Sequence, residues 1–158
     1  MDAESGKDGD AEEDALGRYA RLCFSIYAAH HAFNRAYAPL LEEMGLTYPQ
    51  YLVLAALWTR DRRRVGEIGR ALRLESNTLT PLLKRLEAAG LIRRERDPID
   101  ERAVIAALTP AGAALEATAR GAPARLLGCA GLTPEEAERL AGALDLVRRR
   151  LDGGAQDD

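Results

Sequence analysis

The chain has 158 residues, of which 47% are hydrophobic and 30% are charged, and its formal net charge at pH 7 is −3. These proportions are normal for a soluble protein of one domain or one compact protomer. No apolar run approaches the roughly 20 residues of a membrane span, and the acidic amino terminus lacks a secretory signal pattern, so we expect a cytoplasmic protein without a membrane partner. The two cysteines, Cys23 and Cys129, fit neither a zinc-finger spacing nor a disulfide-rich scaffold.

The amino-terminal part predicts a tail followed by helices. We expect residues 1–14 to form an acidic disordered tail, because seven of them are acidic and one is a lysine. A long helix is predicted at Ala15–Tyr37 and a second at Tyr48–Trp58, where Thr47 and Gln50 fit a capping box. The interval 15–47, which contains Cys23, is assigned to N-terminal helices with expected roles in dimerisation and sensing.

Residues 48–108 predict a winged helix-turn-helix core. Val65, Ile68 and Leu72 mark a short helix, which reaches the next helix through a tight connection. That next helix, residues 76–87, carries an apolar stripe at i, i+3, i+4 and i+7 spacing, formed by Leu79, Leu82, Leu83 and Leu86. We interpret it as the recognition helix, packed through its stripe against the core.

The opposite face of this helix is polar and cationic, and we predict that it enters a major groove. Ser76 is the predicted N-cap, and the free amides beside it suit a phosphate. Pro81 removes a backbone donor within the second turn, so a local irregularity is expected there. The candidate DNA contacts on this helix are Ser76, Asn77, Thr78, Thr80, Lys84 and Arg85.

A hairpin follows, with strands predicted at Leu91–Arg96 and Arg102–Leu108 around a turn-rich segment. Asp100 is expected to pair with Arg102 and stiffen the turn. Taken alone, this pattern also fits an ordinary solvated hairpin, but beside a helix-turn-helix it predicts a wing. Residues 60–102 carry a net charge of +4, which favours phosphate binding. The candidate contacts to phosphates or a minor groove are Arg93, Arg94, Arg96 and Arg102.

The carboxy-terminal interval, residues 109–151, predicts two further helices at Ala111–Leu127 and Pro134–Leu151, before a tail at 152–158. The terminal helices carry more apolar positions than a small winged core can cover. The predicted fold is therefore mainly α with a small β-hairpin: a winged helix-turn-helix whose N- and C-terminal helices form a dimerisation domain. A homodimer places two recognition helices in successive major grooves of a pseudo-palindromic, double-stranded DNA operator.

Several segments resemble the MarR family of transcriptional regulators. Residues 47–52, residues 76–87 and the triplet Asp100-Glu101-Arg102 carry the general likeness, which extends over roughly residues 20–110. The run Leu22-Cys23-Phe24, followed by Tyr27 and Tyr37, is similar to the organic-hydroperoxide regulators of that family. This resemblance implies a dimeric repressor without a cofactor, in which an organic hydroperoxide oxidises Cys23 and DNA is released.

Some positions depart from the family pattern. Asn77 stands where glycine is common, which is expected to alter operator preference. His30 and His31 stand where small or polar residues are usual. Consecutive helical residues point about 100° apart, so the two histidines form no evident chelating pair, and a solvated or packed role is expected.

The chemistry of Cys23 can also be argued from its neighbours. A thiolate reacts with a peroxide to give a sulfenic acid. Tyr27 lies four positions later on the same helical face, so its hydroxyl can donate a hydrogen bond to the thiolate. Tyr37 lies too far from Cys23 to reach its thiol along one straight helix. The resemblance implies that the Tyr37 of the other protomer reaches it across the dimer. From the residues alone, burial as a small apolar side chain is the commoner role for a cysteine.

A role for Cys129 is implied by the resemblance to the two-cysteine branch of these regulators. The resemblance implies that it captures the sulfenate of Cys23 in the other protomer as an intersubunit disulfide, with an inert loop cysteine as the alternative. Other functions stay open: a MarR-type regulator that senses hypochlorite, an electrophile or a reversible phenolic ligand, and a thiol peroxidase that uses Cys23. No phosphate loop, paired acid–base carboxylates or zinc-ligand cluster in the sequence indicates an enzyme.

Overall fold

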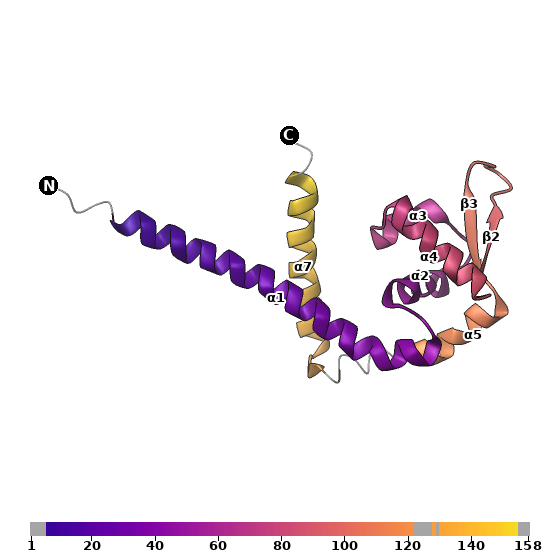
Figure 1. The fold of residues 1–158 in the computed structure, drawn as a ribbon, viewed down its shortest axis with the longest axis horizontal. Helices are drawn as coiled ribbons and strands as arrows, with labels where there is room; N and C mark the ends of the chain where they lie inside the picture. The colour runs from indigo at the N-terminus through magenta and orange to yellow at the C-terminus, as the bar shows by residue number, and fades with distance from the viewer. Residues whose placement is uncertain (1–5, 122–127, 129, 155–158) are drawn as a thin grey trace.

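The computed structural model of the protein describes residues 6–121, 128 and 130–154 (Figure 1). No described helix is long and apolar enough to cross a bilayer. The elements run in the order α1 (Gly6–Met44), α2 (Tyr48–Thr59), β1 (Arg63–Arg64), α3 (Val65–Leu72), α4 (Ser76–Ala88), β2 (Ile92–Arg96), β3 (Val104–Leu108), α5 (Pro110–Ala119) and α7 (Pro134–Gly154).

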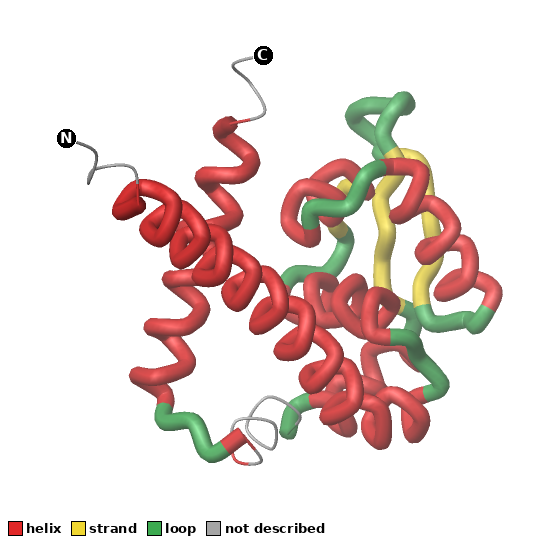
Figure 2. The backbone as a smooth tube through the Cα atoms, turned by 60° about the vertical axis from the view of Figure 1, so that its left-hand side comes forward, coloured by secondary structure: helices red, strands yellow, loops and turns green. Residues whose placement is uncertain are grey.

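The elements from α2 to α5 form a winged helix-turn-helix body, from which α1 and α7 extend (Figures 1 and 2). Its sheet is antiparallel with strand order β1-β3-β2. In the wing, Ile92 lies opposite Leu108 and Arg96 opposite Val104. The mainly helical winged fold predicted from the sequence is confirmed. The third strand, β1, was not predicted, because two consecutive arginines give no apolar alternation to mark it.

The first helix is longer than the sequence predicted. It begins at Gly6, so most of the interval assigned to a disordered tail is helical, and it continues through Pro39 to Met44. Near its carboxy-terminal end, burial of Leu41 and Met44 compensates for the hydrogen bond that Pro39 cannot donate.

The hydrophobic core lies where the end of α1 meets the winged body. Tyr37, Leu41 and Met44 of α1 pack on the buried face of α2, whose Val53, Leu54 and Leu57 are fully buried. The α2 helix begins at the predicted capping box, in which the Thr47 amide donates to Gln50 Oε1 at 2.8 Å. On the other side the core takes in α3, three leucines of α4 (Leu79, Leu83 and Leu86), and strand residues Ile92 and Ala106.

The junction between the wing and α5 is closely packed. Thr109 caps α5 by accepting a hydrogen bond from the Gly112 amide at 3.1 Å, and its hydroxyl donates to the Gly90 carbonyl at 2.6 Å. Trp58 Nε1 donates to the Gly112 carbonyl at 2.9 Å. A Cβ atom at position 112 would lie 1.9 Å from the Leu91 carbonyl oxygen, so only glycine fits there.

The carboxy-terminal helices differ from their predicted bounds. Helix α5 ends at Ala119, well before Leu127, and residues 122–127 lie outside the described part of the chain. Helix α7 begins at the predicted capping box, where Glu136 Oε2 accepts from the Thr133 amide at 2.9 Å. It runs on to Gly154, so the predicted tail at 152–158 begins inside the helix. The salt bridges of Arg148 to Asp145 and Asp152 support this extra turn.

The far end of α7 returns to the helix-turn-helix. Arg73 ends α3 in the left-handed conformation, at φ 52°, and its Nη1 lies 3.3 Å from Asp152 Oδ2. The turn between α3 and α4 is therefore joined to the carboxy-terminal helix by an exposed ion pair.

We predict that Gly112→Ala destabilises the fold by about 3 kcal/mol, because the added methyl group meets backbone that cannot move without breaking the α5 cap. Urea unfolding followed by circular dichroism measures this. Gly66→Ala in α3 is the matched control: a Cβ atom at position 66 would have no neighbour within 4 Å, so this variant should raise stability by up to about 1 kcal/mol. Equal stabilities for the two variants would contradict the packing argument.

Candidate nucleic-acid interface and redox site

The recognition helix α4 presents two distinct faces. Leu79, Leu82, Leu83 and Leu86 are buried, as their spacing predicted. The polar residues proposed to contact DNA all lie on the exposed side, and the helix continues through Pro81 without interruption. Those exposed residues are Ser76, Asn77, Thr78, Thr80, Lys84 and Arg85.

The start of α4 differs from the prediction by one residue. The N-cap is Glu75, whose carbonyl accepts from the amides of Thr78 at 3.0 Å and Leu79 at 2.9 Å. Ser76 is the first helical residue, and its side chain makes no capping hydrogen bond. The prediction of Ser76 as the cap is therefore wrong. A serine one position inside the helix leaves its hydroxyl exposed beside the free amides, where it is available to a phosphate.

The four arginines of the wing divide into two pairs. Arg94 forks onto Glu87 of α4, with Nε 2.9 Å and Nη2 2.5 Å from Oε2, while its amide donates to Oε1 at 3.0 Å. Arg93 Nη1 donates to the Leu108 carbonyl at 2.8 Å. Both side chains thus hold the wing together, which the sequence did not reveal. Arg94 binding lowers the pKa of Glu87, so this carboxylate stays charged at neutral pH.

The other two arginines, Arg96 and Arg102, are exposed. No ion pair among the described residues involves them, and the same holds for Lys84 and Arg85 of α4. Lys84 and Arg85 lie on the exposed face of α4, and Arg96 and Arg102 belong to the wing. They are the groups that can form salt bridges with phosphates without first breaking a salt bridge within the chain.

Asp97 organises the loop at the wing tip and was not singled out by sequence reasoning. It is only 4% exposed, Arg64 Nε lies 2.6 Å from its Oδ2, and the amides of Ile99 and Asp100 donate to its Oδ1 at 2.8 and 3.4 Å. These bonds hold its pKa below the usual value, with the Ile99 amide as the largest cause. The signal that could have found it is the position of Asp97 in a turn, because an aspartate there commonly accepts a hydrogen bond from the backbone amide two residues later.

The predicted pairing of Asp100 with Arg102 takes another form. Asp100 Oδ1 accepts from the backbone amide of Arg102 at 3.2 Å, and no salt bridge joins it to the guanidinium. The backbone amide of Arg102 is closer to the Asp100 carboxylate than the end of the flexible arginine side chain is. The hydrogen bond to this amide stiffens the turn and leaves the Arg102 side chain exposed.

The proposed redox residues are spread along α1. Cys23 is a free, exposed thiol, and Tyr27 is 62% exposed, with its ring 4.3 Å from that of His31. Tyr37 instead packs on Tyr48 in the core, roughly 21 Å along the helix from Cys23 at 1.5 Å per residue. Burial raises the Tyr37 pKa to about 12, so its hydroxyl keeps its proton at neutral pH. Cys129 lies outside the described residues.

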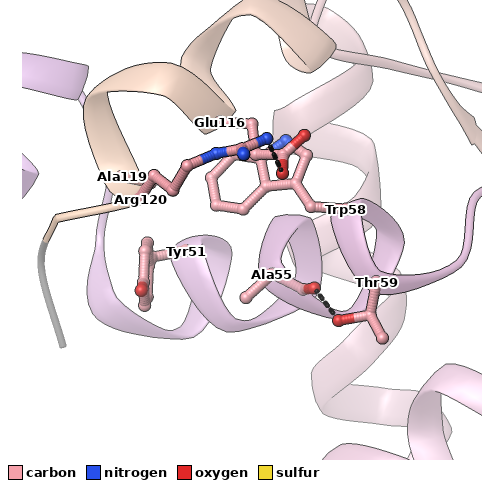
Figure 3. A pocket seen from close by; sticks show the side chains of 7 residues that line it. All are labelled: Tyr51, Ala55, Trp58, Thr59, Glu116, Ala119 and Arg120. Carbon is pink, nitrogen blue, oxygen red and sulfur yellow. Dashed lines mark hydrogen bonds and ion pairs between the residues drawn. The ribbon is translucent and has the colours of Figure 1, made fainter.

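A shallow pocket lies between α2 and α5 (Figure 3). Its volume is about 250 Å³, and Glu116 and Arg120 form an ion pair at its edge, with 2.9 Å between the charged atoms. Cys23 is not among its lining residues, which are Tyr51, Ala55, Trp58, Thr59, Glu116, Ala119 and Arg120.

A recognition helix with an exposed polar face, a preceding helix and a flanking wing together define a winged-helix DNA-binding protein. A family model for the transcriptional regulators SarA and Rot matches residues 35–116. The regulator TtmR of Methylorubrum extorquens is 46% identical over 149 residues, which span 94% of this chain and 74% of TtmR. The organic hydroperoxide resistance transcriptional regulator of Bacillus subtilis is 43% identical over 124 residues, covering 78% of this chain and 84% of the relative.

Solved structures agree. Reduced AbfR bound to DNA, from a protein of Staphylococcus epidermidis, has a TM-score of 0.77 and 34% identity, covering 90% of this chain and 99% of AbfR. Disulfide-formed AbfR has a TM-score of 0.62 at 33% identity, covering 94% and 99%. A MarR variant of Escherichia coli with operator DNA shares the fold, with a TM-score of 0.73 over 84% of this chain and 96% of MarR, at 24% identity. The chain belongs to the MarR/SarA family of DNA-binding transcriptional regulators, and these relatives are regulators, not enzymes.

Two arginines of the wing are predicted to affect DNA binding differently. Arg102→Gln should lower the slope of log affinity against log salt by about 0.9 for each protomer bound, because one phosphate contact is lost. Arg94→Gln should weaken binding at every salt concentration with an unchanged slope, and should lower the melting temperature, because it releases β2 from Glu87. Fluorescence anisotropy at several salt concentrations separates the two, and equal changes in slope would contradict the division.

Lowering the pH should destabilise the wing loop, because Asp97 becomes protonated and loses its ion pair with Arg64. Because its pKa is lowered in the folded chain, the stability that it provides is complete above its ordinary value of 3.8 and is lost as the pH falls through the lowered value. Asp97→Asn cannot pair with Arg64 as a charge, so it should be less stable at pH 7. The difference in urea midpoint between the two proteins should shrink once the pH falls below 3.8, and a constant difference would contradict this role.

Proposed function

We propose that the chain is a homodimeric repressor that binds a pseudo-palindromic operator while Cys23 is reduced and leaves it when an organic hydroperoxide oxidises Cys23. The observation that carries the proposal is the exposed Cys23 thiol on α1 of a regulator 43% identical to an organic hydroperoxide resistance regulator. Tyr27, one helical turn from Cys23, supports it by presenting a hydroxyl on the same face.

Dimerisation is supported by apolar side chains that the single chain leaves uncovered. On α1 these include Phe24, 70% exposed, and Leu22; on α7 they include Leu151, 72% exposed, with Leu140 and Leu144. Exposed apolar residues gathered on two helices indicate an interface. A symmetric dimer through these helices would present two copies of α4 to successive major grooves.

The oxidation step is a displacement at oxygen. The Cys23 thiolate attacks the terminal peroxide oxygen, the O–O bond breaks, and the alkoxide takes up a proton and leaves as an alcohol, which gives the sulfenic acid. The Cys129 thiolate of the partner then attacks the Cys23 sulfur, the S–O bond breaks, and hydroxide leaves and is protonated to water. A disulfide remains, which a thiol reductant reverses.

Tyr37 fits a supporting role because its hydroxyl stays protonated. A neutral phenol donates a hydrogen bond to a thiolate or to the leaving alkoxide, whereas a phenolate would repel both. Its pKa of about 12 keeps it in the donating form at neutral pH. Since it lies far from Cys23 along the same helix, we assign it to the Cys23 site of the partner.

Disulfide formation explains release through geometry. The two Cα atoms must come within about 7 Å, so a bond between protomers constrains how their helices lie. In AbfR the reduced, DNA-bound form and the disulfide form match this chain with TM-scores of 0.77 and 0.62, which supports a change of conformation between such states. Overoxidised AbfR is also bound to DNA, so the disulfide is the species that we connect with release.

The test measures binding to DNA from upstream of the chain's own gene, before and after a stoichiometric dose of cumene hydroperoxide. Reduced wild type should bind and then release, with a disulfide between protomers that dithiothreitol reverses. Cys23→Ser should stay bound throughout. Cys129→Ser should also stay bound, with its Cys23 carrying added oxygen by mass spectrometry. Full retention of DNA by wild type with a verified disulfide would refute the proposal.

A second candidate, a reversible ligand response, is favoured by the pocket beside Trp58. Tyr51 and Trp58 offer aromatic surface, and the paired Glu116 and Arg120 offer polar groups at the edge, a combination that suits a small aromatic ligand with a polar substituent. Release of both wild type and Cys23→Ser by such a ligand, with no effect of peroxide, would select this function. A thiol peroxidase would instead consume many equivalents of peroxide per chain.

A further inference from the structure

The tip of the wing carries an apolar side chain that the chain leaves in water. Ile99 is 90% exposed, more than any other large hydrophobic residue in the described part of the chain. Most of the others lie on α1 and α7, where a second copy would cover them. Ile99 lies in the loop between β2 and β3, and this loop is on the opposite side of the molecule from the amino-terminal end of α1 (Figure 1).

The loop holds Ile99 in this outward position. The Ile99 amide donates to Asp97 Oδ1 at 2.8 Å, and the buried Asp97 is itself bound by Arg64. Below the tip, the Asp97 amide donates to the Ala103 carbonyl at 2.9 Å, and the Ala103 amide donates to the Asp100 carbonyl at 2.8 Å. These bonds fix the backbone of the loop, and with this backbone the Ile99 side chain is exposed.

The wing is also fixed relative to the recognition helix. The fork from Arg94 to Glu87 joins β2 directly to α4, and Arg94 is paired with Ala106 of β3 in the sheet. When α4 enters a major groove, the wing therefore approaches the DNA with it as one rigid unit.

The net charge of the wing tip gives no reason for Ile99 to be exposed there. The exposed ionisable residues around Ile99 are Arg96, Asp100, Glu101 and Arg102, and their charges cancel. Arg96 and Arg102 can each contact a phosphate, but the tip as a whole has no net charge to draw it toward DNA from a distance. Apolar contact remains the main contribution that Ile99 can make, and proteins use isoleucine in this way as a wedge against the floor of a minor groove.

We propose that Ile99 enters the minor groove beside each half-site and selects A·T over G·C pairs there. In the minor groove the two kinds of pair differ by the 2-amino group of guanine. This group projects from the groove floor and is a hydrogen-bond donor, so an aliphatic side chain against it would clash and leave it without a partner. The inference deepens the DNA-binding part of the proposed function and does not depend on its redox part.

The test uses operators in which the A·T pairs flanking each half-site are replaced, one position at a time, by G·C or by inosine·C. Inosine·C has the major-groove groups of G·C but lacks the 2-amino group. Anisotropy is measured on the full chain under reducing conditions and without peroxide. Wild type should lose about tenfold in affinity with G·C at one position per half-site and recover it with inosine·C.

Ile99→Ala should bind the original operator about tenfold more weakly, with an unchanged salt dependence and a much smaller penalty for G·C. Val104→Ala, which trims a 39% exposed side chain at the start of β3, is the matched control and should leave all three quantities unchanged. Melting temperatures confirm that both variants fold.

Two results would overturn the proposal. Unchanged affinity and unchanged G·C penalty in Ile99→Ala would show that the tip stays clear of DNA and leaves Ile99 to a protein partner. An inosine·C penalty as large as that of G·C would show that the position is read in the major groove or through DNA stiffness. Neither result bears on release by peroxide, which the cysteine variants test separately.

Discussion

Burial of the leucine stripe of α4 is the interaction on which the reading surface depends. Leu83 and Leu86 are almost fully buried, and this fixes the rotation of the helix about its axis. Because side chains repeat every 3.6 residues, the same rotation turns Asn77, Lys84 and Arg85 outward together. The polar face is thus positioned by apolar packing on its far side, and any loss of that packing would misdirect every proposed base contact at once.

The arginines of the winged body show how one residue type serves two purposes. Arg64 and Arg94 each bind a carboxylate within the chain, and these bonds shape the wing loop and join the wing to α4. Arg96 and Arg102 remain exposed. A planar guanidinium with several donors suits both tasks, since it can fork onto a carboxylate or a phosphate. The positive charge of this segment therefore overstates how many groups are available to DNA.

The sequence predicted the parts of the fold that local patterns determine. Leucine spacing located α4, and threonine pairs with glutamine or glutamate located the starts of α2 and α7. It did not reveal the role of Asp97, because its partner Arg64 is 33 residues away in the sequence. It did not reveal the role of Arg94 either, because Glu87 lies in another element and only the packing of β2 on α4 brings the two side chains together. The carboxy-terminal end of α1 was misplaced because tertiary packing, as at Met44, overrides local signals.

The ion pair between Arg73 and Asp152 has a practical consequence for anyone who handles this protein. Asp152 lies two residues before the end of α7, so the carboxy terminus is not a neutral place for a purification tag or a truncation. Removing the last turn of α7 would free Arg73, which sits in the turn between α3 and α4. A label placed to report on the carboxy-terminal helix would therefore also change the surroundings of that turn.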